Sequence, residues 1–502
     1  MSNIAVEAPG SEELVVNEFG YRQELRRTLR AFSVFSVAFS IISITTGIFL
    51  NFSFGISELG PVSIWTWPIA AVGQTLVSLV LAELATRIPL AGANYQWGAR
   101  LIGPTYGWFV GALGVLNLSV GLPGIMLLAA APLSEYVLGK DAASKRLTLF
   151  IALLILTFAY LVNVISVQVA TKVNNVAVFT EILGTVFLAV ALFFLWVGGY
   201  KKTDHGIGYL GHAMHPPGQS YWYAIVLASL IGIYTIVGFE TAADMAEEAV
   251  DAKRSVPRAM IGAVVISSVL GMIVLIGFTI AIPNDQVFAE GGLPGVFQYW
   301  IGAALSRTFV AIVVFSMFAL TVVGGAAGAR LLFALGRDNM LPGSKALAKV
   351  NATTKTPLPA LLTSYLLCVM VMLYGYNSGN AFGTLVGATA LAPYLVYLLT
   401  VIAYGSKRHQ LETLPGAFNL GRYAVPVFGA SLVWLIAAVL ALSLPSEFHK
   451  AVLYVVGGLV LATLWWLFGL RPRIAKGTAG PAVIRDVTTA SLAQSSPRTR
   501  GA

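Results

Sequence analysis

The chain has 502 residues, of which 57% are hydrophobic and only 11% charged, and its mean hydropathy is +0.80. Because soluble domains carry about 25% charged residues, this composition excludes a soluble globular protein and predicts an integral membrane protein. The formal net charge of +9 would suit nucleic acid or another anionic partner, but its distribution along the chain indicates orientation in a lipid bilayer instead.

Apolar runs of about 20 residues predict an all-α protein with 12 transmembrane helices. If the N-terminus is cytoplasmic, the inside segments hold 24 of the 31 Lys and Arg residues. The positive-inside rule then places both termini in the cytoplasm of a multi-pass plasma-membrane protein. The runs are 31–57, 62–86, 104–131, 147–167, 173–198, 222–248, 258–282, 306–329, 358–376, 380–404, 424–443 and 451–469.

Two of these runs are interrupted at equivalent places. The first carries Ser43-Ile44-Thr45-Thr46-Gly47, and Gly47 and Gly238 each lie about 16 residues into their runs. Paired interruptions point to inverted repeats around a site at the membrane midplane. The chain then divides into an N-terminal tail (1–30), five-helix repeats at 31–199 and 222–405, helices 11 and 12 (424–469), and a disordered tail (471–502). Alternatively, small residues merely let the first helix pack closely.

Three carboxylates lie inside apolar runs and are candidates for proton coupling: Glu181, Glu240 and Asp244. A charge at the centre of a membrane helix costs about 2.5–3.5 kcal/mol or more, so each needs a partner or a function. The structural alternative is that Glu240 lies paired in a kinked helix and that Glu181 pairs with Lys172 or with a neighbouring helix. Glu247 and Glu248 continue the acidic side of the sixth run. We expect them to pair with Lys253, Arg254 or other loop cations.

The two interruptions offer opposite halves of a substrate site. N–H groups that open the second half of the first helix suit a carboxylate, and free carbonyls in the sixth suit an ammonium group. This combination matches an amino acid. Asn117 is expected to bond another helix, Glu83 and Arg87 to form an ion pair, and Phe239 to gate the pocket or simply pack. The candidate substrate-binding residues are Ser43, Ile44, Thr45, Thr46, Gly47, Ile48, Ile236, Val237, Gly238, Phe239 and Glu240.

Four stretches resemble amino-acid permeases of the amino acid-polyamine-organocation superfamily, especially the amino acid/choline branch that includes GABA permeases. They lie at 39–48, 82–97, 238–258 and 329–342. The resemblance implies the leucine-transporter-type fold, with discontinuous helices 1 and 6, and alternating access. The stretch 174–181 resembles the start of helix five in proton-coupled members, some of which have lysine where Glu181 stands. The chain departs from the family pattern with Thr45-Thr46-Gly47 instead of Gly-x-Gly, with Glu240 for Asp and with Asp244 for His.

These observations predict a secondary active transporter (a permease) of amino acids or related amines, working by proton symport, with sodium as a possible coupling ion. Choline or polyamine transport and amino-acid exchange remain alternatives, and a non-transporting sensor would require a larger output domain. An enzyme is not expected, because the sequence shows no nucleophile–base constellation, no metal-ligand spacing among its five histidines and no phosphate-binding loop. We therefore assign no catalytic or metal residue and no cofactor.

Overall fold

The computed structural model describes residues 13–139, 144–377, 381–411 and 417–482. Over these residues the chain is helical and has no β-strand beyond one isolated bridge between Leu29 and Ala249. Eleven described helices or helix pairs are long and apolar enough to cross a membrane, and Tyr221–Thr235 is a shorter apolar helix. The helices are α1 (Glu13–Glu18), α2 (Ala31–Ile42), α3 (Ile44–Leu59), α4 (Thr66–Arg87), α5 (Ala93–Leu101), α6 (Pro104–Pro132), α7 (Lys145–Ile165), α8 (Val167–Val197), α9 (Tyr221–Ala228), α10 (Leu230–Thr235), α11 (Thr241–Asp244), α12 (Ala252–Ile280), α13 (Asp285–Arg337), α14 (Ser344–Leu347), α15 (Leu358–Asn377), α16 (Ala381–Lys407), α17 (Ala424–Ala441), α18 (His449–Trp465) and α19 (Arg471–Ala475).

Both interrupted runs are discontinuous in the structure, but to different extents. In the first, only Ser43 leaves the helical conformation, and it separates α2 from α3. In the sixth, residues 236–240 are not helical, and they separate α10 from the single turn of α11. The first break is therefore tighter than the sequence suggested, because Thr45, Thr46 and Gly47 already belong to the first turn of α3.

The helices differ strongly in how much of their surface is covered by protein. Within one apolar 18-residue stretch of each span, 72% of the residues are buried in Ala31–Leu59 and in Pro61–Arg87 and 78% in Asp285–Arg337, whereas 22% are buried in Gly421–Ala441 and 11% in Ser446–Ala475. The pair α2–α3 and helix α13 thus lie at the centre, and α17 and α18 lie at the periphery. Apolar side chains such as Phe468, 80% exposed, cover the outer surface, as expected where lipid is the solvent.

Helix α13 begins earlier than the apolar run 306–329 predicts. Asn284 caps its start by accepting the Val287 N–H at 2.9 Å, and the helix then bends at Gly292 (φ 54°) and Gly302 (φ 78°). The residues before Gly302 therefore form a separate helical arm. A hydropathy window does not detect it, because its residues are too mixed in polarity to form a spanning run.

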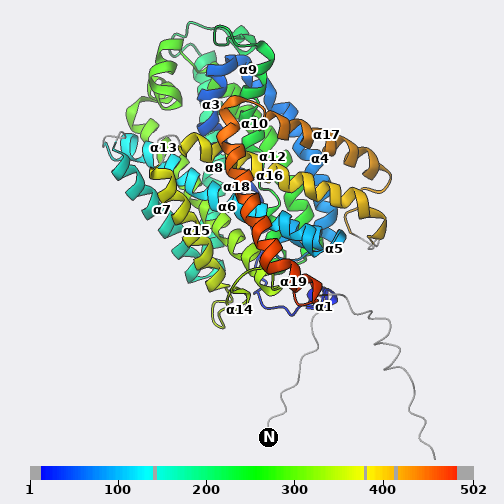
Figure 1. Cartoon of the computed structure of the whole chain (residues 1–502). Helices are drawn as coiled ribbons and strands as arrows, with labels where there is room; N and C mark the ends of the chain where they lie inside the picture. Colours follow the sequence, from blue (N-terminus) through cyan, green and yellow to red (C-terminus); the bar gives the residue numbers. More distant parts are fainter. Residues whose placement is uncertain (1–12, 140–143, 378–380, 412–416, 483–502) are drawn as a thin grey trace, which may run out of the picture.

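Both ends of the described chain lie at one end of the bundle. Helices α1, α14 and α19 are together there, and α9 lies at the opposite end (Figure 1). The segment after α1 is packed into the protein, since Leu25 and Leu29 are only 2% and 1% exposed. Part of the predicted N-terminal tail is therefore packed against the helices. The predicted disordered tail begins with α19, and its residues 483–502 lie outside the described part.

Candidate functional site

The break in the first interrupted helix is built around Ser43. Its left-handed conformation (φ 36°, ψ 82°) ends α2 and starts α3, and serine is a favoured helix N-cap. Its Oγ accepts the Thr46 N–H at 3.3 Å, and its carbonyl accepts the Gly47 N–H at 2.9 Å. The N–H groups that we expected to face a substrate carboxylate are therefore engaged inside the break in this arrangement.

Glu181 of α8 reaches the same break. Its side chain is buried, and its Oε1 accepts the Ser43 hydroxyl at 3.0 Å and the Thr45 N–H at 3.1 Å. Next to it, the hydroxyls of Thr45 and Thr185 are 2.6 Å apart. A carboxylate here is favoured by the partial positive charge at the N-terminus of α3. The Lys172 pairing considered from the sequence does not occur among the described ion pairs.

The second break is held by α16. Gly238 adopts a left-handed conformation (φ 87°), and its N–H donates to Tyr397 Oη at 2.8 Å. Tyr397 donates its own proton to Glu240 Oε2 and stacks on Phe239 with ring centroids 5.3 Å apart. Tyr394 donates to the Ile233 carbonyl at 2.9 Å. Sequence reasoning missed both tyrosines, although their spacing of three inside an apolar run places them on one helix face.

Two adjoining cavities lie between the breaks, with volumes of about 70 and 50 Å³. The larger is lined by hydroxyl-bearing and apolar residues, and the smaller contains the carboxylates of Glu240 and Asp244. Residues common to both are Ile41, Asn117, Leu118, Gly238 and Pro393. The larger is also lined by Thr46, Gly47, Tyr234, Thr235 and Val237, and the smaller by Asn94, Tyr95 and Thr241.

The predicted site residues divide into two groups. Those that line a cavity are Thr46, Gly47, Val237, Gly238, Glu240 and Asp244. Those that line neither cavity are Ser43, Ile44, Thr45, Ile48, Ile236, Phe239 and Glu181, which are buried behind the first group. Asn117 was expected to bond another helix. Instead it lines both cavities, and its amide has no hydrogen bond among the described residues.

The other acidic residues considered from the sequence, Glu83, Glu247 and Glu248, form ion pairs. Glu83 and Arg87 form the expected ion pair at 3.7 Å. Glu248 pairs with Arg330 at 2.6 Å, and Glu247 pairs with Arg337 at 3.0 Å. Pairing of Glu247 and Glu248 was predicted correctly. Their partners, however, come from the membrane helix α13 and not from the basic residues that follow Glu248, of which Lys253 pairs with Glu18.

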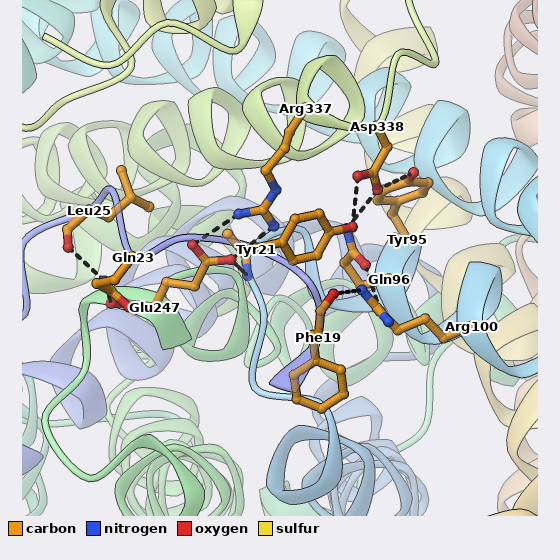
Figure 2. A network of polar contacts seen from close by, with 11 residues as sticks. Phe19, Tyr21, Gln23, Leu25, Tyr95, Gln96, Arg100, Glu247, Arg337 and Asp338 are labelled. Atoms are coloured by element: carbon orange, nitrogen blue, oxygen red, sulfur yellow. Dashed lines mark hydrogen bonds and ion pairs between the residues drawn. The ribbon is translucent and has the colours of Figure 1, made fainter. Parts of the chain in front are cut away.

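A polar network around Asp338 lies at the end of the bundle that holds α1 (Figure 2). Asp338 accepts the hydroxyls of Tyr21 and Tyr95, both at 2.7 Å, and the Gln96 amide at 2.9 Å. Burial raises the pKa of Asp338 above its usual value, although these hydrogen bonds and Arg337 act against the shift. Burial and the nearby Asp338 raise the pKa of Tyr21 to about 12, so its phenol remains a donor.

The segment after α1 contacts two separate parts of the chain, the end of α13 and the turn that follows α11. The Tyr21 ring lies 3.7 Å from the guanidinium of Arg337, which also binds Glu247 (Figure 2). The Gln23 amide donates to the Glu247 carbonyl at 2.8 Å, and the N–H groups of Thr28 and Leu29 donate to the Glu248 carbonyl at 2.9 and 3.0 Å. This segment, residues 19–29, thus joins α13 to the turn that follows α11.

Comparison with known proteins gives consistent matches over nearly the whole chain. The model of a family described as "Amino acid permease" matches residues 29–468. The chain is 27% identical to the amino-acid permease BAT1 of Arabidopsis thaliana, over 92% of this chain and 95% of that protein. It is 27% identical to a BAT1 homolog of Oryza sativa subsp. japonica, over 91% and 93% of the two chains. It is 25% identical to the GABA-specific permease of Saccharomyces cerevisiae, over 88% and 79%.

Proposed function

The chain belongs to the amino acid permease family, and from that premise we propose that it is a secondary active transporter of amino acids or closely related amines in the plasma membrane. The observation that carries this proposal is the pair of cavities between the breaks at Ser43 and at 236–240, lined from both sides by polar groups. A site between two discontinuous helices is where alternating-access transporters bind their cargo.

The architecture that we propose has 12 crossings arranged as two inverted five-helix repeats. Helices α9, α10 and α11 together would form the sixth crossing, which is too interrupted to count as a single long helix. The proposal is supported by the similar positions of Gly47 and Gly238 in their runs and by the peripheral location of α17 and α18, which follow the repeats. The end that holds α1 and α19 would face the cytoplasm.

In this site an amino acid would lie across both cavities. Its ammonium group would approach Glu240 and Asp244 in the smaller cavity, with the Asn117 amide between the two halves. Its carboxylate would approach Thr46 and Gly47 at the start of α3, where the helix dipole favours an anion. The cargo therefore needs both charges. The two carboxylates also favour the polyamine alternative, which the test below includes.

We further propose symport with protons, with Glu181, Glu240 and Asp244 as candidate carriers. All three are buried carboxyls, and among the described residues none of them forms an ion pair. A carboxylate without a cationic partner in a low-dielectric site can become neutral by taking up a proton. Exchange of one amino acid for another and coupling to sodium are the alternatives that transport measurements must separate.

The test uses the full chain, purified and reconstituted into proteoliposomes. We expect amino acids, including GABA, to compete for uptake better than choline or putrescine, because only zwitterions satisfy both halves of the site. An imposed pH gradient, acidic outside, should drive accumulation. Stronger competition by putrescine than by any amino acid would establish the polyamine alternative. Uptake that depends on sodium and not on pH would replace the proton as the coupling ion.

A further inference from the structure

Three oxygen-bearing side chains connect the buried interior of α8 to the larger cavity. Glu181 Oε1 lies 3.0 Å from Ser43 Oγ, which lies 2.7 Å from Thr46 Oγ1. Thr46 lines the cavity, whereas Glu181 and Ser43 do not. We propose that these residues form a hydrogen-bond relay, through which a proton on Glu181 turns the Thr46 hydroxyl into a donor for the substrate carboxylate. The inference rests on the proposed function and identifies how the coupling proton would act on binding.

The number of protons that Ser43 can supply decides the direction of the relay. Its Oγ is within donating distance of both Glu181 and Thr46, but a hydroxyl has one proton and two lone pairs. It also accepts the Thr46 N–H at 3.3 Å. Only one of the two neighbouring oxygens can therefore receive the Ser43 proton at a time, and the other contact must be made with a proton from the opposite side.

When Glu181 is ionised, the Ser43 proton goes to the carboxylate, because hydrogen bonds to a charged acceptor are about twice as strong as neutral ones. Ser43 and Thr46 oxygens 2.7 Å apart would repel each other without a proton between them. Thr46 must then provide that proton. Its hydroxyl is turned toward Ser43, and it presents only a lone pair to the cavity, which disfavours a substrate carboxylate.

When Glu181 takes up a proton, the direction of the relay reverses. The acid proton donates to Ser43 Oγ, and the Ser43 proton now fills the short contact with Thr46. The Thr46 hydroxyl is released and can donate into the cavity, close to the start of α3. Protonation of a group outside the cavity thereby creates an anion-binding donor inside it. Because such coupling is reciprocal, a bound carboxylate would in turn favour protonation of Glu181.

No charged side chain among the described residues forms an ion pair that would fix the charge of Glu181. Glu181 has no ion pair among the described residues, and α2 carries no charged residue at all. The other helices packed against α8 carry charges only at positions that form no ion pair with Glu181. These charged residues are Glu58 on α3, Lys145 and Arg146 on α7, Lys253, Arg254 and Arg258 on α12, and Asp285, Glu290, Arg307, Arg330 and Arg337 on α13.

The test is the pH dependence of amino-acid binding to the purified full chain, measured by calorimetry with the best-bound amino acid from the competition panel. We expect the wild-type affinity to rise about tenfold from pH 8 to pH 5, the effect of one hydrogen bond to a charged group. Ser43→Gly removes the middle hydroxyl and suits the left-handed backbone at this position. Thr46→Val removes the last hydroxyl and keeps the side-chain shape. Both variants should lose most of the pH dependence although Glu181 is intact.

Two further variants separate the relay from a general loss of packing. Thr46→Ser keeps a hydroxyl and should keep the pH dependence. Thr185→Val removes a buried hydroxyl beside the same break, paired with Thr45 and outside the relay, and should also keep it. A Ser43→Gly or Thr46→Val protein that binds with the full wild-type pH dependence would overturn the relay. If the wild type binds no amino acid at any pH, the proposed function itself fails.

Discussion

The role of a single residue is clearest for Glu181, which the sequence presents only as a carboxylate in an apolar run. In the structure its carboxyl caps the start of α3 and replaces the missing helix bond of Thr45. A buried carboxylate in this position is compensated by hydrogen bonds and by the helix dipole, and not by a cation. A group that is stable in both charge states is suited to carry a proton through a transport cycle.

We therefore predict the effect of Glu181→Gln. Both contacts of the Glu181 carboxyl, with the Ser43 hydroxyl and with the Thr45 N–H, are made by Oε1, where the amide oxygen of glutamine can accept both bonds but cannot take up a proton. The variant should bind amino acids with an affinity that no longer changes between pH 8 and pH 5, and it should exchange them across proteoliposomes. It should not accumulate them against a gradient when the outside is acidified. Undiminished proton-driven accumulation would exclude Glu181 as the required carrier and make Glu240 the next candidate.

At the scale of helices, the two breaks bring their backbones unusually close to neighbouring elements. A Cβ atom on Gly47 would lie 2.2 Å from Thr235 Oγ1 and 2.6 Å from Thr235 Cβ. A Cβ on Gly238 would lie 2.0 Å from Ile41 Cγ2, and its positive φ disfavours any other residue. Each glycine thus permits one broken helix to contact the other across the candidate site.

The corresponding prediction is that Gly47→Ala and Gly238→Ala each weaken amino-acid binding at least tenfold while the protein still inserts into the membrane. Even a methyl group must push α3 away from α10, or Gly238 away from α2, and this displacement changes both cavities. The matched control is Gly457→Ala, since a Cβ on Gly457 of α18 meets no atom within 4 Å. Unchanged affinity in both site variants would show that the substrate lies elsewhere.

The sequence predicts these breaks but not what surrounds them. An ordinary membrane helix would not contain a glycine, a run of hydroxyl residues or a carboxylate inside its apolar segment. The amino-acid sequence alone therefore shows where the breaks lie. Tyr397, Arg330 and the cavity-lining Asn117 lie on other helices, and the residues next to them in the sequence do not indicate which groups they lie near. The extra helical arm before Gly302 escaped detection because its residues do not form an apolar run.

At the scale of the whole molecule, alternating access requires that each end of the bundle can be closed. The segment 19–29 joins Asp338 and Arg337 at the end of α13 to the residues after α11, and we propose that this connection closes one end. In the proposed orientation this end faces the cytoplasm. Opening it would expose Asp338, whose pKa is raised by burial in the closed form. A group with the higher pKa in the closed form binds a proton more tightly there, so lowering the pH through that pKa favours closure.

Tyr21→Phe should change how this closure depends on pH. The variant keeps the ring over Arg337 but removes one of the three hydrogen bonds to the buried Asp338, a loss of about 1.5–3 kcal/mol for a bond to a charged group. Loss of a donor destabilises the carboxylate more than the neutral carboxyl, so the pKa of Asp338 should rise further. Closure should therefore be weakened most at high pH and least in acid.

Hydrogen exchange of the backbone amides in residues 19–29 measures this closure directly. We expect exchange in Tyr21→Phe to be about ten- to a hundredfold faster than in the wild type at pH 8, after correction for the intrinsic rate, and the difference to shrink toward pH 5. Tyr423→Phe is the control, because Tyr423 also contacts an arginine but lies on the exposed surface. If Tyr21→Phe exchanges no faster than this control, residues 19–29 are held by packing alone and Asp338 does not regulate the closed end.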